Sequence, residues 1–434
     1  MALWAQIANE IMNYNAIYLI FIIGTIFLAG IIIVKKIMIK GINGFIAVCD
    51  PLVISLILSE LSAAVVPIYM YINGWFYDDK MFYSYFLSEI ALFFGIFVAT
   101  GLANKNIIID EKKDTSIVIK KRFYIATTFV YFVLKIIYFA KVGIPIFSDK
   151  YYTLLMAEET FLSRIIICFY LMVCMLWIDS LTYIKAKINY LVGALIVASF
   201  IFSAQKGLIA YFLFAMFFHQ LFRLKKGKTI INLSPLKIFS IICVAFLSVM
   251  IPLIITSLSH DEWDPIRMLI FRFIGNGDAF PIFYASQSTS GIINEHTGII
   301  EYIAANMSGF KIDFGYVTSH NPMEELGNVY VGIGQDYIAP LIRHNIIGIK
   351  LFGVEFAFLY SLIIGLLIGF VSRYVLRKIK GLNYITYIIY ADLYLGLVHC
   401  TSNYIVSNYF DPVIIDTIFI YIFYKANTII KNKI

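Results

Sequence analysis

The sequence predicts an all-α polytopic membrane protein. Hydrophobic residues make up 61% of the 434 residues, charged residues only 14%, and the mean hydropathy is +0.85. A soluble domain is typically about 45–50% apolar and about 25% charged, and a soluble chain as apolar as this one would expose large apolar patches to water. Because apolar segments recur along nearly the whole length, we expect one transmembrane domain, 1–434, and no soluble domain.

About eleven segments are long and apolar enough to cross the membrane as helices, since a spanning helix needs about 20 apolar residues. They lie at 14–34, 51–72, 82–102, 123–141, 161–183, 188–204, 206–222, 238–257, 347–372, 383–405 and 411–426. No basic segment precedes the first span, and Lys35 and Lys36 follow it. This pattern indicates a retained helix rather than a cleaved signal peptide.

The distribution of basic residues predicts the orientation of the spans. With the N-terminus outside, the cytoplasmic segments hold 23 of the 34 Lys and Arg residues, the outer segments hold 10, and Lys135 lies within a span. Short loops rich in Lys and Arg stay in the cytoplasm, so we expect the N-terminus outside and the C-terminus in the cytoplasm. The net charge of +7 then has the same origin, and nucleic-acid binding is not needed to explain it.

The longest connection is an outer loop at 258–346. A connection of this length is usually functional or disordered. This loop contains aromatic residues and apolar runs rather than low-complexity sequence, so we expect it to fold partly as helices lying on the membrane. One candidate is 265–275, where apolar residues recur at helical spacing from Ile266 onward.

The clearest charged residues within predicted spans are Glu60, Glu89, Lys135, Glu355, Asp392 and Asp416. Each is costly, from about 2.5 kcal/mol upward at the bilayer centre. They could form a proton or ion relay, or they could form interhelical pairs and face wet cavities. We favour the second interpretation because the six positions are scattered along the sequence.

Basic residues are disfavoured on the predicted outer side, and four of those found there are candidates for a site: Arg267, Arg272, Lys206 and Arg343, the last followed by His344. A guanidinium binds phosphate through paired hydrogen bonds. We therefore predict that these four residues bind a diphosphate group. The alternative is pairing with carboxylates of the loop or with ordinary lipid phosphates.

A polar, proline-broken segment at 319–327 carries the candidate catalytic residues. His320 could act as a general base near neutral pH, and Glu324 or Glu325 could do the same. The segment also has the features of a capped helix start, and both interpretations can hold together. There is no nucleotide-binding or metalloprotease motif, and the cytoplasmic loops are short. We therefore expect neither a cofactor nor a metal, and no nucleotide substrate.

Local motifs and the overall layout together resemble one family. The motifs are the Gly-Ile-Pro-Ile-Phe-Ser segment at 143–148, the small-residue turn at 203–207, the loop start with Arg267, Arg272 and Asp278, and the run from His320 to Gly334. With about eleven spans and a large late outer loop, the chain resembles the O-antigen and capsule polymerases, the Wzy family. Lys206 stands where that family usually has arginine, which leaves the role of this position open.

The resemblance implies a glycosyltransferase with a GT-C-like architecture in the bacterial inner membrane. Such enzymes join undecaprenyl-diphosphate-linked oligosaccharide repeat units at the periplasmic face, so 258–346 would be a periplasmic loop. The donor diphosphate supplies the free energy, and cations are needed where its charge develops. The family works among membrane lipids, usually beside a chain-length regulator protein, and needs no nucleic acid.

The resemblance also suggests which residues contact sugar. We assign this role to Asp278, Trp263, Tyr284 and Asn321, with the aromatic rings stacking on sugar faces. For any one aromatic residue, anchoring at the membrane interface is the stronger alternative.

Two other functions fit parts of the pattern. An O-antigen ligase, or another lipid-carrier glycosyltransferase, shares the layout and the chemistry. A flippase or transporter for lipid-linked oligosaccharides would be expected to show two similar halves and short loops, which the sequence lacks.

Overall fold

The computed structural model describes a set of ranges that covers the middle of most predicted spans. These are residues 44–55, 60, 62–101, 121–144, 160–183, 187–203, 207–225, 254, 275–277, 279–284, 343–377, 384–399, 418, 422 and 425. These residues are almost entirely helical and include no strand, which confirms the predicted all-α class. The predicted spans 14–34, 238–257 and 411–426 lie outside the described residues, apart from single positions.

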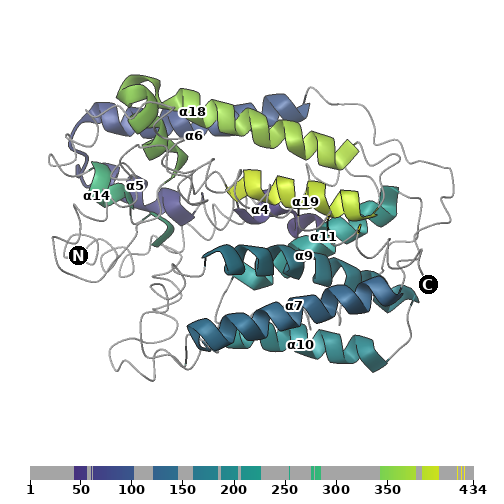
Figure 1. Cartoon of the computed structure of the whole chain (residues 1–434). Helices are drawn as coiled ribbons and strands as arrows, with labels where there is room; N and C mark the ends of the chain where they lie inside the picture. Colours follow the sequence, from purple (N-terminus) through teal and green to yellow (C-terminus); the bar gives the residue numbers. More distant parts are fainter. Residues whose placement is uncertain are drawn as a thin grey trace, which may run out of the picture.

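The helices follow the predicted spans closely where both are described. They are α3 (Gly44–Val48), α4 (Pro51–Ser55), α5 (Ser62–Ile72), α6 (Asp79–Gly101), α7 (Lys121–Val142), α9 (Thr160–Tyr183), α10 (Lys187–Ser203), α11 (Gly207–Lys225), the 3₁₀ turn η3 (Gly275–Gly277), α14 (Ala279–Tyr284), α18 (His344–Arg377) and α19 (Tyr384–His399). Figure 1 shows α6 and α18 side by side at one edge, α7 and α10 at the other, and α9, α11 and α19 between them.

Three of the described helices are long and apolar enough to cross a membrane, through Asp79–Thr100, Phe123–Val142 and His344–Arg373. Their outward faces carry large apolar side chains. Phe97 is 73% exposed on α6, Phe129 is 68% exposed on α7, and Phe370 is 59% exposed on α18. Such faces would be unfavourable in water and suit contact with lipid, so the chain is a helical membrane protein.

Glycines set the close packing of α6 against α18. A Cβ atom on Gly365 would overlap the backbone carbonyl of Leu92, and one on Gly95 would lie 2.7 Å from the carbonyl oxygen of Leu362. Gly369 lies equally close to Ile96. Small residues at four-residue spacing let two membrane helices approach to backbone contact. Gly365 of α18 meets Leu92 of α6, and Gly369, one turn later in α18, meets Ile96, one turn later in α6. The two helices therefore run parallel.

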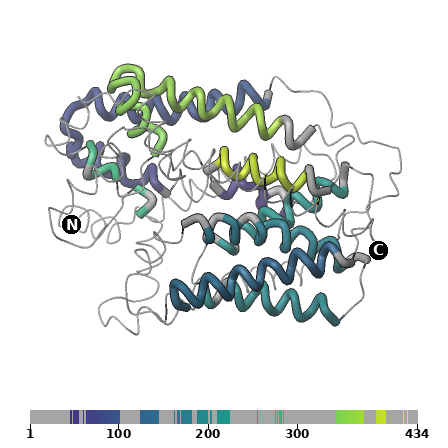
Figure 2. Tube along the Cα trace, viewed as in Figure 1, coloured from purple at the N-terminus to yellow at the C-terminus, as the bar shows by residue number. Residues whose placement is uncertain are grey.

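A break at Gly353 divides α18 into a short arm, 344–352, and a long arm, 354–377. Gly353 has φ 76° and ψ 170°, and this left-handed φ favours glycine because it has no Cβ. The short arm folds back against the long arm, with Gly348 in contact with Ala357, and Figure 2 shows the sharp bend. The predicted span at 347–372 lies within α18, and the structure adds a break at Gly353 that the prediction did not include.

The remaining long helices form a second packed group around α9, joined by polar contacts. The Trp177 indole donates a hydrogen bond to the Asn189 carbonyl at 2.8 Å. Gly193 makes room for that ring, since a Cβ there would lie 2.8 Å from it. The Tyr131 hydroxyl of α7 bonds the Ser199 hydroxyl of α10 at 2.7 Å. These bonds fix neighbouring helices where apolar surface alone is not selective.

Removing the Tyr131 hydroxyl should therefore cost a modest amount of stability. We expect Tyr131→Phe to lower the free energy of unfolding by about 0.6 kcal/mol, and at most about 1.7 kcal/mol, the range found for such bonds in membrane proteins. Detergent unfolding of Tyr131→Phe, Ser199→Ala and the double variant measures the coupling. Strictly additive losses would show that the two hydroxyls do not interact.

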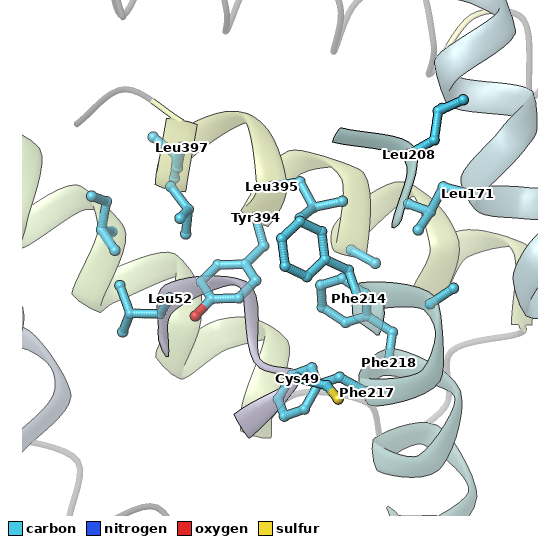
Figure 3. Packing of buried hydrophobic residues seen from close by; sticks show 14 of the residues in the cluster. Cys49, Leu52, Leu171, Leu208, Phe214, Phe217, Phe218, Tyr394, Leu395 and Leu397 are labelled. Atoms are coloured by element: carbon cyan, nitrogen blue, oxygen red, sulfur yellow. The ribbon is translucent and has the colours of Figure 1, made fainter. Parts of the chain in front are cut away.

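The centre of the molecule is an apolar core between α11, α19 and the α3–α4 segment. Phe218 of α11 packs edge to face on Tyr394 of α19, with ring centroids 6.0 Å apart, and Figure 3 shows Phe217 beside Cys49. The Tyr394 hydroxyl donates to Oδ1 of Asp50 at 3.0 Å. The same oxygen accepts from the backbone N–H two residues on, at 2.8 Å, so Asp50 caps α4.

Part of the predicted outer loop inserts into the helix bundle. A Cβ on Gly277 would lie 2.8 Å from the Ala63 carbonyl oxygen of α5, and Phe280 and Tyr284 of α14 are fully buried. The Tyr77 N–H donates to the Tyr284 carbonyl at 2.9 Å. This part of the loop therefore packs inside the protein rather than on the membrane surface. The candidate surface helix at 265–275 lies outside the described residues, apart from its last residue.

Candidate functional site

The most highly charged buried site in the described part of the chain combines four side chains from three segments. Arg343 and His344 stand at the start of the short arm of α18, Glu89 lies in the middle of α6, and Glu60 lies between α4 and α5. Arg343, His344 and Glu60 are at most 4% exposed. We refer to these four residues as the charged cluster.

The charged cluster is held by short contacts between opposite charges. The guanidinium Nη2 of Arg343 lies 2.6 Å from Oε1 of Glu60. The Nε2 atom of His344 lies 3.6 Å from Oε2 of Glu60 and 3.5 Å from Oε1 of Glu89. The cluster therefore brings one permanent cation, one titratable imidazole and two carboxylates within contact of one another.

Hydrogen bonds orient the imidazole and one carboxylate. The Nδ1 atom of His344 bonds the Ser361 hydroxyl at 2.8 Å. The Asn345 side-chain amide donates to Oε1 of Glu89 at 3.4 Å. Ser361 lies on the long arm, so the fold-back at Gly353 is what brings this hydroxyl to His344.

The break in α18 also sets how far the charged cluster lies from the bend at Gly353. His344 and Ser361 lie nine and eight residues from Gly353, about 12–13 Å along the two arms. Glu89 lies ten residues after Asp79 in the 23-residue helix α6, which places it about 15 Å from that end. The charged cluster therefore sits near the middle of α6, beside the partly positive N-terminus of the short arm.

Aromatic side chains border the cluster. Tyr85 and Tyr284 are both buried, with ring centroids 6.4 Å apart, and Tyr284 stacks on Phe280 at 5.8 Å. Burial raises the pKa of the Tyr284 hydroxyl well above its usual value, and the nearby Glu89 carboxylate adds to the effect. Tyr284 therefore stays neutral and can serve as a hydrogen-bond donor.

Two of the residues that the sequence analysis assigned to a site are described. Arg343, a predicted diphosphate ligand, is fully buried and paired with Glu60. Tyr284, a predicted sugar contact, is fully buried among rings, so it does not anchor the chain at a membrane surface. A sugar could reach its ring only if the aromatic residues around it moved apart, and its role stays a prediction.

The other predicted site residues lie outside the described residues. They are His320, Glu324, Glu325, Arg267, Arg272, Lys206, Asp278, Trp263 and Asn321. Their predicted catalytic, diphosphate-binding and sugar-binding roles therefore stay predictions.

Sequence reasoning found the members of the charged cluster but not their proximity. The sequence identifies Glu60 and Glu89 as costly charges within spans, and Arg343 as a disfavoured cation followed by His344. Their scatter along the sequence favours interhelical pairs over a relay, and it does not predict that both carboxylates converge on one histidine. The polar Arg-His-Asn start of an otherwise apolar helix was the available signal.

A second buried polar group joins α9 to α11. The Nε2 atom of His219 lies 3.0 Å from Oδ1 of Asp179, and Nη1 of Arg223 lies 3.8 Å from the same oxygen. All three side chains are at most 7% exposed. The sequence analysis did not single out these three residues, and we assign the group a structural role.

Comparison with known proteins found no relative of this chain. No family model, no curated protein and no solved structure matches this chain. The function therefore has to be argued from the sequence and the site.

Proposed function

We propose that the protein is a glycosyltransferase that joins undecaprenyl-diphosphate-linked oligosaccharide repeat units into O-antigen or capsular polysaccharide. The reaction would form a glycosidic bond between the reducing-end sugar of the donor and a hydroxyl of the acceptor. The hydroxyl proton goes to a base, and undecaprenyl diphosphate leaves. This proposal rests on the resemblance to the Wzy polymerases together with the chemistry of the charged cluster.

The observation that carries the proposal is the meeting of Arg343 with two carboxylates and a histidine inside an apolar helical protein. Departure of a diphosphate needs a cation where negative charge develops, and Arg343 is such a group. Attack by a sugar hydroxyl needs a base, and Glu89, whose Oε1 lies 3.5 Å from Nε2 of His344, is a described carboxylate that could serve as one. His320, Glu324 and Glu325 remain our first candidates for the base.

We further propose the membrane arrangement that this reaction requires. It has about eleven spans in the bacterial inner membrane, the N-terminus outside, the C-terminus cytoplasmic and a GT-C-like architecture with its active site at the periplasmic face. This arrangement directs the third and ninth spans the same way through the membrane. The parallel course of α6 and α18, described above, supports that part of the proposal.

The proposal predicts polymer formation without a nucleotide. Purified full-length protein, supplied with its lipid-diphosphate-linked repeat unit in detergent, should give a ladder of products on a gel. Arg343→Lys keeps the positive charge but loses the paired geometry of a guanidinium, so we expect the rate to fall about 100-fold. We expect similar losses for Arg267→Ala, Arg272→Ala and His320→Ala.

The matched control is Arg373→Ala, which removes an arginine from the long arm of α18 far from the cluster and should leave the ladder unchanged. All variants must elute as the wild type does on size exclusion. Absence of a ladder from folded wild type with the cognate substrate would overturn the polymerase proposal. A ladder that survives every site substitution would keep the function and remove these residues from the site.

One observation favours a transporter of lipid-linked oligosaccharides as the second candidate. Transporters often use broken helices and place charged groups near the middle of the membrane, and α18 combines both features. Translocation of a labelled lipid-linked oligosaccharide across vesicles, without polymer formation, would establish this alternative.

A further inference from the structure

The imidazole of His344 has an unusual arrangement. Its Nδ1 atom is bonded to the Ser361 hydroxyl, whereas Nε2 is fully buried and has no hydrogen-bond partner among the described residues. Nε2 instead faces Glu60 and Glu89, at 3.6 and 3.5 Å. A neutral imidazole that donates from Nδ1 would direct the lone pair of Nε2 at two carboxylates, which is repulsive unless a cation lies between them.

The distances suit a metal ion as that cation. Bond lengths of about 2.0–2.2 Å to nitrogen and oxygen place neighbouring ligand atoms about 3.3–3.6 Å apart in a tetrahedral site. The separations of 3.5 and 3.6 Å from Nε2 of His344 match this spacing and exceed a good hydrogen bond. One ligand atom each from Glu60, Glu89 and His344 all lie within 4.8 Å of one another.

The groups around these three side chains act as supporting partners. Arg343 contacts Oε1 of Glu60, which leaves Oε2 directed at the imidazole. Asn345 donates to Glu89. Metal-binding histidines and carboxylates are commonly oriented by a second group. Here His344 and Glu89 are hydrogen-bonded to Ser361 and Asn345, and Glu60 is ion-paired with Arg343.

The charge balance also favours a bound cation. Glu60 and Glu89 carry two negative charges when ionised, and Arg343 supplies one positive charge. An uncompensated charge is costly at this depth in a membrane protein. These three charges sum to −1. A proton on Nε2 of His344 would bring the sum to zero, and a divalent ion there would bring it to +1.

We propose that Glu60, Glu89 and His344 form a binding site for a divalent first-row transition-metal ion. Two carboxylates and one imidazole form a mixed ligand set that suits Mn²⁺ or Zn²⁺ better than Mg²⁺ or Ca²⁺. Three protein ligands leave room for water or a substrate oxygen in a further position. The site differs from the sequence expectation of no metal, and it does not rest on the proposed function.

The test is a metal titration of the full-length protein in detergent, without substrate. After treatment with a chelator and its removal, free Mn²⁺ is followed by electron paramagnetic resonance, and Zn²⁺ is added as a competitor. We expect one ion per chain. Glu89→Gln and His344→Ala should weaken binding about tenfold or more. The control is Glu355→Gln, which changes an exposed carboxylate on α18, the helix of His344, and should bind as the wild type does.

A measurement on the wild type keeps the test independent of whether the variants fold. Pulsed resonance of the Mn²⁺-loaded protein should show magnetic coupling to an imidazole nitrogen, and absence of that coupling would overturn the proposal. Equal binding by folded Glu89→Gln, His344→Ala and wild type would overturn it too. Folded wild type that binds neither ion would also overturn the proposal, without bearing on polymer formation.

Discussion

Replacing Arg343 with alanine should destabilise the protein by about 3–5 kcal/mol, which is the usual cost of breaking a buried ion pair. The Arg343 side chain is 0% exposed and that of Glu60 is 2% exposed, with 2.6 Å between Nη2 and Oε1. Without the guanidinium, the Glu60 carboxylate stays buried beside a second carboxylate, Glu89. Thermal unfolding in detergent, followed by size exclusion, measures the loss.

Two further variants separate this electrostatic cause from simple loss of packing. Adding Glu60→Gln to Arg343→Ala removes the uncompensated charge, so the double variant should be more stable than Arg343→Ala alone. Arg373→Ala removes a partly exposed arginine from the same helix and should change stability by less than about 1 kcal/mol. A double variant that is less stable than Arg343→Ala would show that charge is not the cause.

Enlarging Gly365 should disrupt the packing of α6 against α18. A Cβ at this position would overlap the Leu92 carbonyl and lie 3.2 Å from the Ile96 backbone nitrogen. Backbone atoms cannot rotate away as a flexible side chain can. We therefore expect Gly365→Ala to cost about 1–3 kcal/mol. Gly365→Leu should leave little folded protein, since total stability is only about 5–15 kcal/mol.

The matched control is Gly275→Ala, because a Cβ on Gly275 would meet nothing within 4 Å. Thermal unfolding and the yield of monodisperse protein should distinguish the two positions clearly. Equal stability of Gly365→Ala and Gly275→Ala would show that α6 and α18 are not packed at backbone contact.

The extents of most helices were predictable from the sequence because they follow from local composition. The spans predicted at 123–141 and 161–183 correspond to α7 and α9, and each bound differs by at most two residues. A long apolar run forms a helix in lipid whatever its neighbours are, because every backbone polar group must be satisfied within the segment.

The break in α18 was not predictable in the same way. The apolar run continues on both sides of Gly353, and glycine is common in membrane helices. Nothing local distinguishes this glycine from Gly365, which is helical and serves in packing. The left-handed φ at Gly353 is stabilised by contacts of the short arm with the long arm, such as that of His344 with Ser361.

The helical membrane class, and the charges that would be costly to bury, can be deduced from the sequence alone. Composition and hydrophobic run length decide these properties, and both are local. In contrast, Glu60 and Glu89 meet Arg343 and His344 through tertiary packing, across more than 250 positions along the chain. Their proximity depends on the fold-back at Gly353 and on the glycine contacts between α6 and α18, and packing between distant segments leaves no periodic signal in the sequence.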